Sequence, residues 1–354
     1  MYPKNGKLSL PVDLIRTVAI ILVILLHAAT EPYPTVSIMS PQGVQIWWAS
    51  NVYDSLARLC VPLFIMLTGA LLLQPSKVDE PLRVFFKKRW NRIGLPILFW
   101  GAAYFAWRAF VNGETLTANS IALGVLTGPY IHFWYVYLLI GLYLTTPILR
   151  VVVKYSDWKL LRYFLLLWVV GTALIPLFTL LEPYNLNANV FLLAGWLGYY
   201  FLGGYLLGVK LKRSILYLML IVGIAWTIIG TYIVVGTLGE RFSQIFYDSF
   251  SFNMIIASVA LFLLLSAIPS QRVETRFPRG NGALRLISQN TLPIYLFHVM
   301  VLETLRKGFL GFKISLTTMN PIVEIPLITA VTLLICLAVI IPLKKIPYVK
   351  RLIG

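Results

Sequence analysis

The sequence has few of the residues from which a water-soluble surface is built. Only 12% of its 354 residues are charged, whereas 59% are hydrophobic. Apolar runs of about 20 residues, which span a bilayer at about 1.5 Å per helical residue, recur along nearly the whole chain. This composition leaves no room for a sizeable soluble domain. It predicts an all-α polytopic membrane protein in which residues 1–354 form a single integral-membrane domain.

Cysteine and histidine are scarce as well. The two cysteines, Cys60 and Cys336, both lie in apolar segments, which argues against a disulfide framework and against a thiolate metal site. The three histidines, His27, His132 and His298, show no metal-ligand spacing to one another, to a cysteine or to an acid. We therefore expect no bound metal.

Acidic residues are the minority charge, with 13 Asp and Glu against 30 Lys and Arg, for a net charge of +17. The chain has no soluble basic patch interleaved with aromatic residues, so we expect no nucleic-acid partner. Instead the positive-inside rule explains the excess, because placing the N terminus in the cytoplasm puts most basic residues on that side. The basic residues left toward the other side are Arg58, Arg108, Arg241, Arg306, Lys307 and Lys313.

This charge alternation predicts about ten transmembrane helices with both termini cytoplasmic, in the cell membrane. Between the first two, residues 43–57 are expected to form a short extracytoplasmic helix near the membrane surface, anchored by Trp47 and Trp48. The predicted spans lie near residues 10–29, 59–73, 94–111, 133–150, 160–181, 190–209, 215–236, 251–268, 288–306 and 323–343.

The first predicted span carries ionisable residues that a lipid-facing helix avoids. Arg16 and His27 are 11 positions apart, which places them within about 20° of each other on a helix and about 16 to 17 Å apart along its axis. Asp13 and Glu31 could lie on the same stripe. Ionisable residues within a span are functional candidates. The alternative is structural: Arg16 reaches the headgroups and pairs with Asp13, and His27 is an interfacial residue.

Two further groups add to this picture. His132 opens the fourth predicted span, and His298 lies about ten residues into the ninth. The stretch "FFKKRWNRIGLP" contains Arg89 and Arg92, which share a helix face if the helix begins early enough. Two planar guanidinium forks on one face suit a phosphorylated cofactor. The alternative is an ordinary basic membrane flank.

These residues resemble the membrane-bound acyltransferase family 3. Its hallmarks are an arginine and a histidine separated by ten residues in the first helix, here "RTVAIILVILLH", and an R-x-x-R motif, here "RWNR". Supporting similarity comes from "VPLFIMLTGALLL", "RIGLPILFW", "HFWYVYLLIGLYLTTPILR" and "LPIYLFHVMVL". The resemblance implies transfer of an acyl group, often acetyl from acetyl-CoA as co-substrate, to a hydroxyl of a cell-surface polysaccharide, a lipid-linked sugar or a glycolipid. Some relatives carry a fused hydrolase-like domain with a serine nucleophile, which these residues lack, so we expect direct transfer or a separate partner.

The spacing and the resemblance lead to one expected site. Arg89, Arg92 and Arg16 are predicted to bind the phosphates of a CoA thioester from the cytosol. His27 is predicted to act as general base on the acceptor hydroxyl, with Glu31, or more weakly Asp13, as its partner. His132 and His298 are predicted substrate-binding residues, and polysaccharide-assembly proteins are expected partners. The alternatives are a transporter or flippase for a lipid-linked saccharide, and an accessory membrane subunit.

Overall fold

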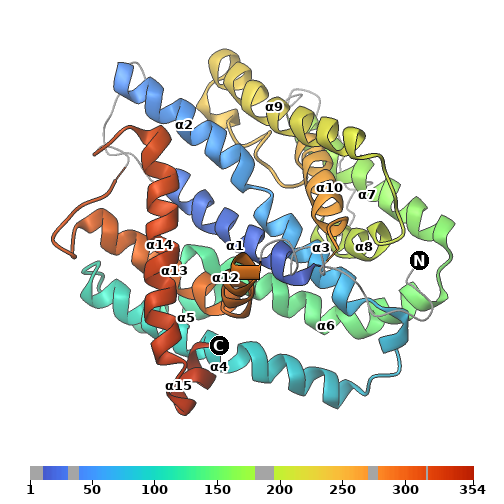
Figure 1. Ribbon diagram of the computed structural model, residues 1–354, viewed down its shortest axis with the longest axis horizontal. Coiled ribbons are helices and arrows are strands. Elements are labelled where there is room, and N and C mark those ends of the chain that lie inside the picture. The colour runs from blue at the N-terminus through green and yellow to red at the C-terminus, as the bar shows by residue number, and fades with distance from the viewer. Residues whose placement is uncertain (1–10, 31–39, 180–194, 270–277, 316–317) are drawn as a thin grey trace. The chain divides into compact units, whose positions relative to one another are not determined.

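The computed structural model describes residues 11–30, 40–179, 195–269, 278–315 and 318–354 (Figure 1). Within these ranges every regular element is a helix, which confirms the all-α prediction. The chain divides into two compact units. The first comprises Met1–Lys77 and Arg150–Ser288, and the second comprises Val78–Leu149 and Gln289–Gly354.

The first unit combines helices from two separate parts of the sequence. In it α1 packs against α2, α3 and α10, while α9 packs against α10 and α2. Its helices are α1 (Val12–Ala29), α2 (Pro41–Ala57), α3 (Cys60–Leu72), α7 (Trp158–Thr179), α8 (Gly195–Leu206), α9 (Arg213–Leu238), α10 (Phe252–Ser266) and α12 (Pro278–Gln289), with short 3₁₀ helices η1 (Pro75–Lys77) and η5 (Glu240–Phe242).

The second unit joins two distant parts of the sequence. Here α13 packs against α14 and α4, and α15 packs against α4 and α14. Its helices are α4 (Leu82–Phe110), α5 (Ala118–Thr127), the short η2 (Ile131–Phe133), most of α6 (Trp134–Tyr155), α13 (Thr291–Lys307), α14 (Pro321–Leu343) and α15 (Pro347–Ile353).

Local sequence sets several of the helix ends. Ser40 caps α2, because its hydroxyl oxygen accepts a hydrogen bond from the backbone N–H of Gly43 at 3.0 Å. Thr117 and Ser120 form a reciprocal capping box at the start of α5. Gly308 ends α13 in the left-handed conformation, with φ of 74°, which glycine adopts without strain. The helix predicted at 43–57 is confirmed as α2; its place at a membrane surface stays a prediction.

Within the described residues, six helical segments are long and apolar enough to cross a membrane. The other four predicted spans are also helical where described, over α7, α8, α10 and α13. The total of ten and the side on which the termini lie stay predictions. The six segments are Val12–Ala29, Pro41–Leu72, Leu82–Phe110, Ala118–Tyr155, Arg213–Leu238 and Pro321–Leu343.

Arg150 of α6 holds the end of α3 in place. Only 2% of this arginine is exposed. Its Nε donates to the carbonyl of Leu72 at 2.7 Å, and one terminal nitrogen donates to the carbonyl of Lys77 at 3.1 Å. The carbonyls at the end of a helix lack intrahelical partners, so the guanidinium satisfies groups that would be left unbonded.

Helices α3 and α8 cross with their backbones in contact, because glycines stand at the crossing. A Cβ added to Gly69 would lie 1.9 Å from the carbonyl oxygen of Tyr200, and one added to Gly203 would lie 1.9 Å from that of Met66. Backbone atoms cannot move aside as flexible side chains do. Small residues of this kind allow close approach of helices in an apolar environment.

We expect Gly203→Ala to destabilise the protein by several kcal/mol, since the added methyl group forces α3 and α8 apart. Thermal unfolding of the purified protein in detergent measures the effect. Gly236→Ala in α9 is the matched control, because no atom lies within 4 Å of a Cβ added there. Alanine should stabilise that helix by up to about 1 kcal/mol. Equal melting temperatures for the two variants would contradict the close crossing.

Candidate active site

Helix α1 runs without interruption through both Arg16 and His27. It extends from Val12 to Ala29, with an acid, Asp13, in its first turn and His27 in its last. An acid at the start of a helix and a histidine at its end both complement the helix dipole. The angular relation predicted for Arg16 and His27 therefore applies, because it depends only on a continuous helix.

The stripe that joins Arg16 to His27 is the packed side of α1. Ile20 and Ile24 lie between them at helical spacing, four, four and three residues apart, and both are 0% exposed. Arg16 and His27 themselves are partly buried. A lipid-facing stripe would have exposed its isoleucines. The two ionisable residues thus project on the side of α1 that the rest of the protein covers.

Asp13 belongs to a contact between α1 and α12. The hydroxyl of Ser288 donates to Asp13 Oδ1 at 2.6 Å, and the hydroxyl of Thr17 donates to the carbonyl of Leu284 at 3.0 Å. Asp13 precedes His27 by 14 residues, about 21 Å along the helix, which is too far to orient the imidazole. Glu31, the other predicted partner, lies outside the described residues.

The R-x-x-R arginines lie on α4, which begins at Leu82 and therefore holds both in one helix. Arg92 is exposed and Arg89 is partly buried. The Arg89 guanidinium carbon lies 5.1 Å from the ring centroid of Phe85 and 5.5 Å from that of Tyr143. Aromatic faces hold an arginine by cation–π attraction and leave its N–H groups directed to other acceptors.

The structure brings the two other histidines together. The ring centroids of His132, on η2, and His298, on α13, are 5.4 Å apart, and both residues are 0% exposed. Tyr104 and Tyr295 flank His132, with centroid distances of 4.9 and 5.6 Å. The Tyr295 hydroxyl also donates to the His132 carbonyl at 2.5 Å. Both rings are packed among aromatic residues, and their predicted role in substrate binding stays a prediction.

The proton of His298 can be placed on one ring nitrogen. Its Nδ1 lies 2.6 Å from the carbonyl oxygen of Tyr295. A carbonyl oxygen only accepts hydrogen bonds, so Nδ1 is the protonated nitrogen. In the neutral ring the lone pair then lies on Nε2, and the backbone of α13 fixes this tautomer.

Sequence reasoning missed a carboxylate that lies beside this aromatic cluster. Glu303 of α13 accepts hydrogen bonds from the Trp107 indole N–H, at 2.7 Å, and from the Tyr130 hydroxyl. Tyr130 also lies 4.8 Å from Tyr104, centroid to centroid. The signal was present, since Glu303 is an acid inside the predicted ninth span. Its partners could not be read from spacing.

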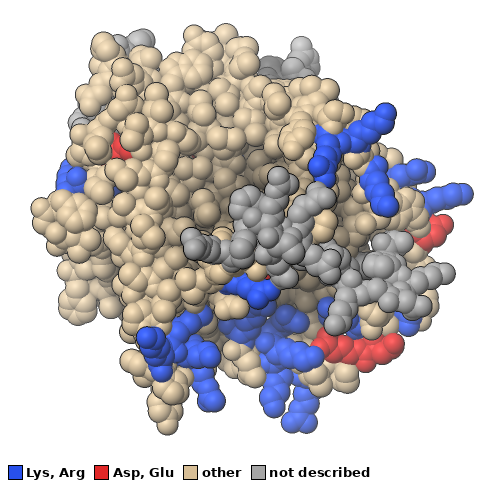
Figure 2. All heavy atoms as spheres, in the orientation of Figure 1, with Lys and Arg blue, Asp and Glu red and all other residues tan. Residues whose placement is uncertain are grey.

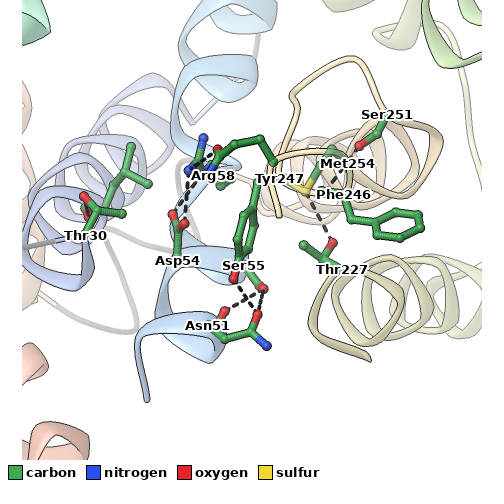
Figure 3. Close-up of polar contacts among 12 residues, drawn as sticks. Thr30, Asn51, Asp54, Ser55, Arg58, Thr227, Phe246, Tyr247, Ser251 and Met254 are labelled. Carbon is green, nitrogen blue, oxygen red and sulfur yellow. Dashed lines mark hydrogen bonds and ion pairs between the residues drawn. The ribbon is translucent and has the colours of Figure 1, made fainter. Parts of the chain in front are cut away.

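A second polar network, in the first unit, was missed as well (Figure 3). Asp54 lies in the last turn of α2, and Arg58 directly follows the helix. Their side chains form a two-bond ion pair with distances of 2.9 and 3.1 Å. The Arg58 guanidinium lies 5.1 Å from the ring centroid of Tyr247, whose hydroxyl donates to Asn51 Oδ1 at 2.6 Å. Burial and the Asp54 charge raise the pKa of Tyr247, so the phenol keeps the proton that it donates.

In the described part of the chain, no three His, Cys, Asp or Glu side chains form a group that could hold a metal ion. What the two units carry instead is a partly buried arginine and histidine on one helix, exposed guanidinium groups, and buried imidazole, phenol and carboxylate groups. An imidazole in such surroundings suits proton transfer, and guanidinium groups suit anion binding.

The fold and these residues define a membrane-embedded helical protein with groups for acid–base chemistry. A model of the acyltransferase-3 family, described as an acyltransferase domain, matches residues 11–341 and so covers both units. The chain belongs to this family. No protein of curated function and no solved structure matches it.

We expect Asp54→Ala to lower the free energy of unfolding by about 3 kcal/mol, because it leaves the Arg58 charge largely buried without its carboxylate. Chemical denaturation in detergent measures the loss. The double variant Asp54→Ala/Arg58→Met should recover part of it.

Glu114→Ala is the control, since it breaks the more exposed pair with Arg108, and it should change stability by less than about 1 kcal/mol. If Asp54→Ala has an equally small effect, or if the double variant is no more stable than the single one, the network around Arg58 does not stabilise the fold.

Proposed function

We propose that this protein transfers an acyl group, acetyl from acetyl-CoA, to a hydroxyl of a carbohydrate. The acceptor would be a cell-surface polysaccharide, a lipid-linked sugar or a glycolipid. The observation that carries the proposal is the stripe of α1 in a chain of the acyltransferase-3 family: Arg16 and His27 lie on the packed side of one continuous helix. Such a position favours chemistry over a topological role.

His27 is the proposed general base. Its imidazole takes the proton of the acceptor hydroxyl as the oxygen attacks the thioester carbonyl, and returns a proton to the departing thiol. The acyl–sulfur bond breaks as the acyl–oxygen bond forms, so charges and atoms balance without a metal. Glu31, four residues later, is the proposed carboxylate that orients the ring.

Arg16, Arg89 and Arg92 are the proposed phosphate-binding residues. The guanidinium groups offer pairs of parallel N–H donors, which match phosphate oxygens. The structure supports this fit, since neither Arg89 nor Arg92 takes part in an ion pair of the described residues. The packing of Arg89 on Phe85 and Tyr143 reduces its freedom to move, so less entropy is lost on binding.

His132 and His298 are proposed to act on the acceptor side. Because both rings are buried, we propose that they position the residues around the acceptor and do not contact the acceptor directly. The proposal further includes ten spans with both termini cytoplasmic, residence in the cell membrane, cytosolic acetyl-CoA, and polysaccharide-assembly proteins that supply the acceptor. The positive-inside distribution of Lys and Arg supports this topology.

Replacement of His27 by Ala should reduce acyl transfer about 10²- to 10⁴-fold, the usual contribution of a general base. The measurement is release of free CoA from acetyl-CoA by purified protein with acceptor present, together with mass spectrometry of surface glycans from cells carrying each variant. A lost mass increment of one acetyl group identifies both the acyl group and the acceptor.

Thr30→Ala is the control for this helix end, because the Thr30 hydroxyl bonds only to its own helix in the described structure, at the carbonyl of Leu26. It should keep near-normal activity. Release of no CoA by the wild-type protein with any acceptor would favour the transporter class, and a His27→Ala loss of only a few-fold would remove His27 from the chemistry.

Arg92→Lys should weaken CoA binding about tenfold or more, because lysine keeps the charge but loses the two-bond fork. Calorimetry or equilibrium binding in detergent measures this. Lys87→Ala, an exposed neighbour on α4, is the control and should bind CoA as the wild type does. An unchanged affinity for Arg92→Lys would return the R-x-x-R motif to the role of a membrane flank.

A further inference from the structure

Four basic residues lie in and just before the last helix of the second unit. Lys345, Lys350 and Arg351 are exposed, and Lys344 is partly buried, in the segment 344–354, here called the α15 segment. Figure 2 shows Lys and Arg side chains gathered at the lower edge of the view, over the area in which Figure 1 places α15 and α4. The simpler explanation of these basic residues is that they form a cytoplasmic flank of a membrane span.

The α15 segment is fixed to α4 rather than merely following α14. The indole N–H of Trp100 donates to the carbonyl of Ile353 at 3.2 Å, and both residues are buried. The backbone of Gly354 lies so close to α4 that an added Cβ would be 3.3 Å from Pro96 Cγ. A flank that served only topology would not need such an attachment.

The part of α4 that holds this segment is the stripe that carries the R-x-x-R motif. Arg89, Arg92, Pro96 and Trp100 follow one another at three, four and four residues, so they lie within a strip about 80° wide. Arg92 is one turn, about 6 Å, from Pro96 along the helix. The α15 segment therefore lies along the motif's own face of α4.

Among the ion pairs of the described residues, none involves Arg92, Lys344, Lys350 or Arg351, and Glu80, the acid just before α4, pairs with Lys88 at 2.7 Å. No Asp or Glu occurs in residues 81–113 or 325–354. The ammonium group of Lys344 lies 3.5 Å from the carbonyl of Gln289. Burial lowers the pKa of Lys344, and the nearby charge of Lys350 lowers it further. Like charges held together in this way are stabilised by a bound anion.

We propose that Lys344, Lys350 and Arg351 form, with Arg92, a phosphate-binding surface for the nucleotide end of a CoA thioester, and that the α15 cations take its 3′-phosphate. This rests on the proposed function, since it extends the predicted CoA site to a second element. A phosphate monoester carries up to two charges and suits lysine point charges, whereas the arginine forks suit the diphosphate. An anionic lipid headgroup offers related phosphate chemistry, so the test separates the two sources.

The test compares CoA with dephospho-CoA, which lacks only the 3′-phosphate. Full-length protein in nanodiscs of phosphatidylcholine is titrated with each, as the wild type and as Lys350→Ala/Arg351→Ala. We expect the double variant to lose about tenfold or more in affinity for CoA and to bind dephospho-CoA as the wild type does. Lys212→Ala/Arg213→Ala removes the same charge from exposed residues of the first unit and should leave both affinities unchanged.

A folding defect is separated from a binding defect by Lys350→Arg/Arg351→Lys, which retains both charges and should retain CoA binding. Unchanged CoA affinity in Lys350→Ala/Arg351→Ala, or equal losses for CoA and dephospho-CoA, overturns the assignment of the 3′-phosphate while the R-x-x-R proposal stands. If the wild type binds no CoA, the proposed function itself fails.

The lipid source is examined in nanodiscs that contain phosphatidylglycerol. Native mass spectrometry counts the phosphatidylglycerol molecules retained by the wild type and by Lys350→Ala/Arg351→Ala. Loss of retained lipid with unchanged CoA affinity would assign the surface to headgroups and overturn the CoA proposal. Equal lipid retention, with CoA affinity lost, supports it.

Discussion

Polar groups inside this chain must find partners within the chain, because neither lipid hydrocarbon nor a packed apolar interior offers hydrogen bonds. In the described structure, bonds between segments distant in sequence supply many of these partners. Arg150 donates to the carbonyl at the end of α3, Ser288 donates to Asp13, and Trp107 donates to Glu303. Each bond that removes an unsatisfied group also fixes one helix against another. The energetic penalty for an unpaired polar group thus specifies where the helices pack.

The same penalty gives meaning to the polar residues on α1. Arg16 and His27 lie on the side of the helix that also buries Ile20 and Ile24, where an ionisable group is expensive to keep. A thioester needs surroundings with little water, since water would compete with the acceptor hydroxyl for the acyl group. A helix that carries a base on its packed side provides both the base and the exclusion of water. The first unit therefore carries the proposed base, His27, together with Arg16, and the second unit carries the other two proposed phosphate-binding arginines, Arg89 and Arg92.

Several features follow from local rules and were predicted correctly. The helical character of the ten apolar segments, where they are described, follows from composition, and α2 follows from the interfacial pair of tryptophans. The common face of Arg16 and His27 follows from a spacing of 11 residues on any straight helix. The prediction of Asp13 as a weaker partner of His27 is not among these features, because the same arithmetic separates the two by about 21 Å along the helix. The contact of Asp13 with Ser288 could not be predicted from spacing.

The sequence by itself determined the class of protein, the helices and the angular order of residues along each one, because these depend on composition and on the period of a single helix. Only the tertiary structure decided that His132 meets His298, that Tyr130 and Trp107 converge on Glu303, and that Tyr247 joins Asp54 and Arg58. It also decided that Trp100 holds the α15 segment against the face of α4 that carries Arg92. These contacts join residues on different helices, so the period of a single helix cannot predict them. They arise from the packing of side chains between helices and from the requirement that buried polar groups be hydrogen-bonded.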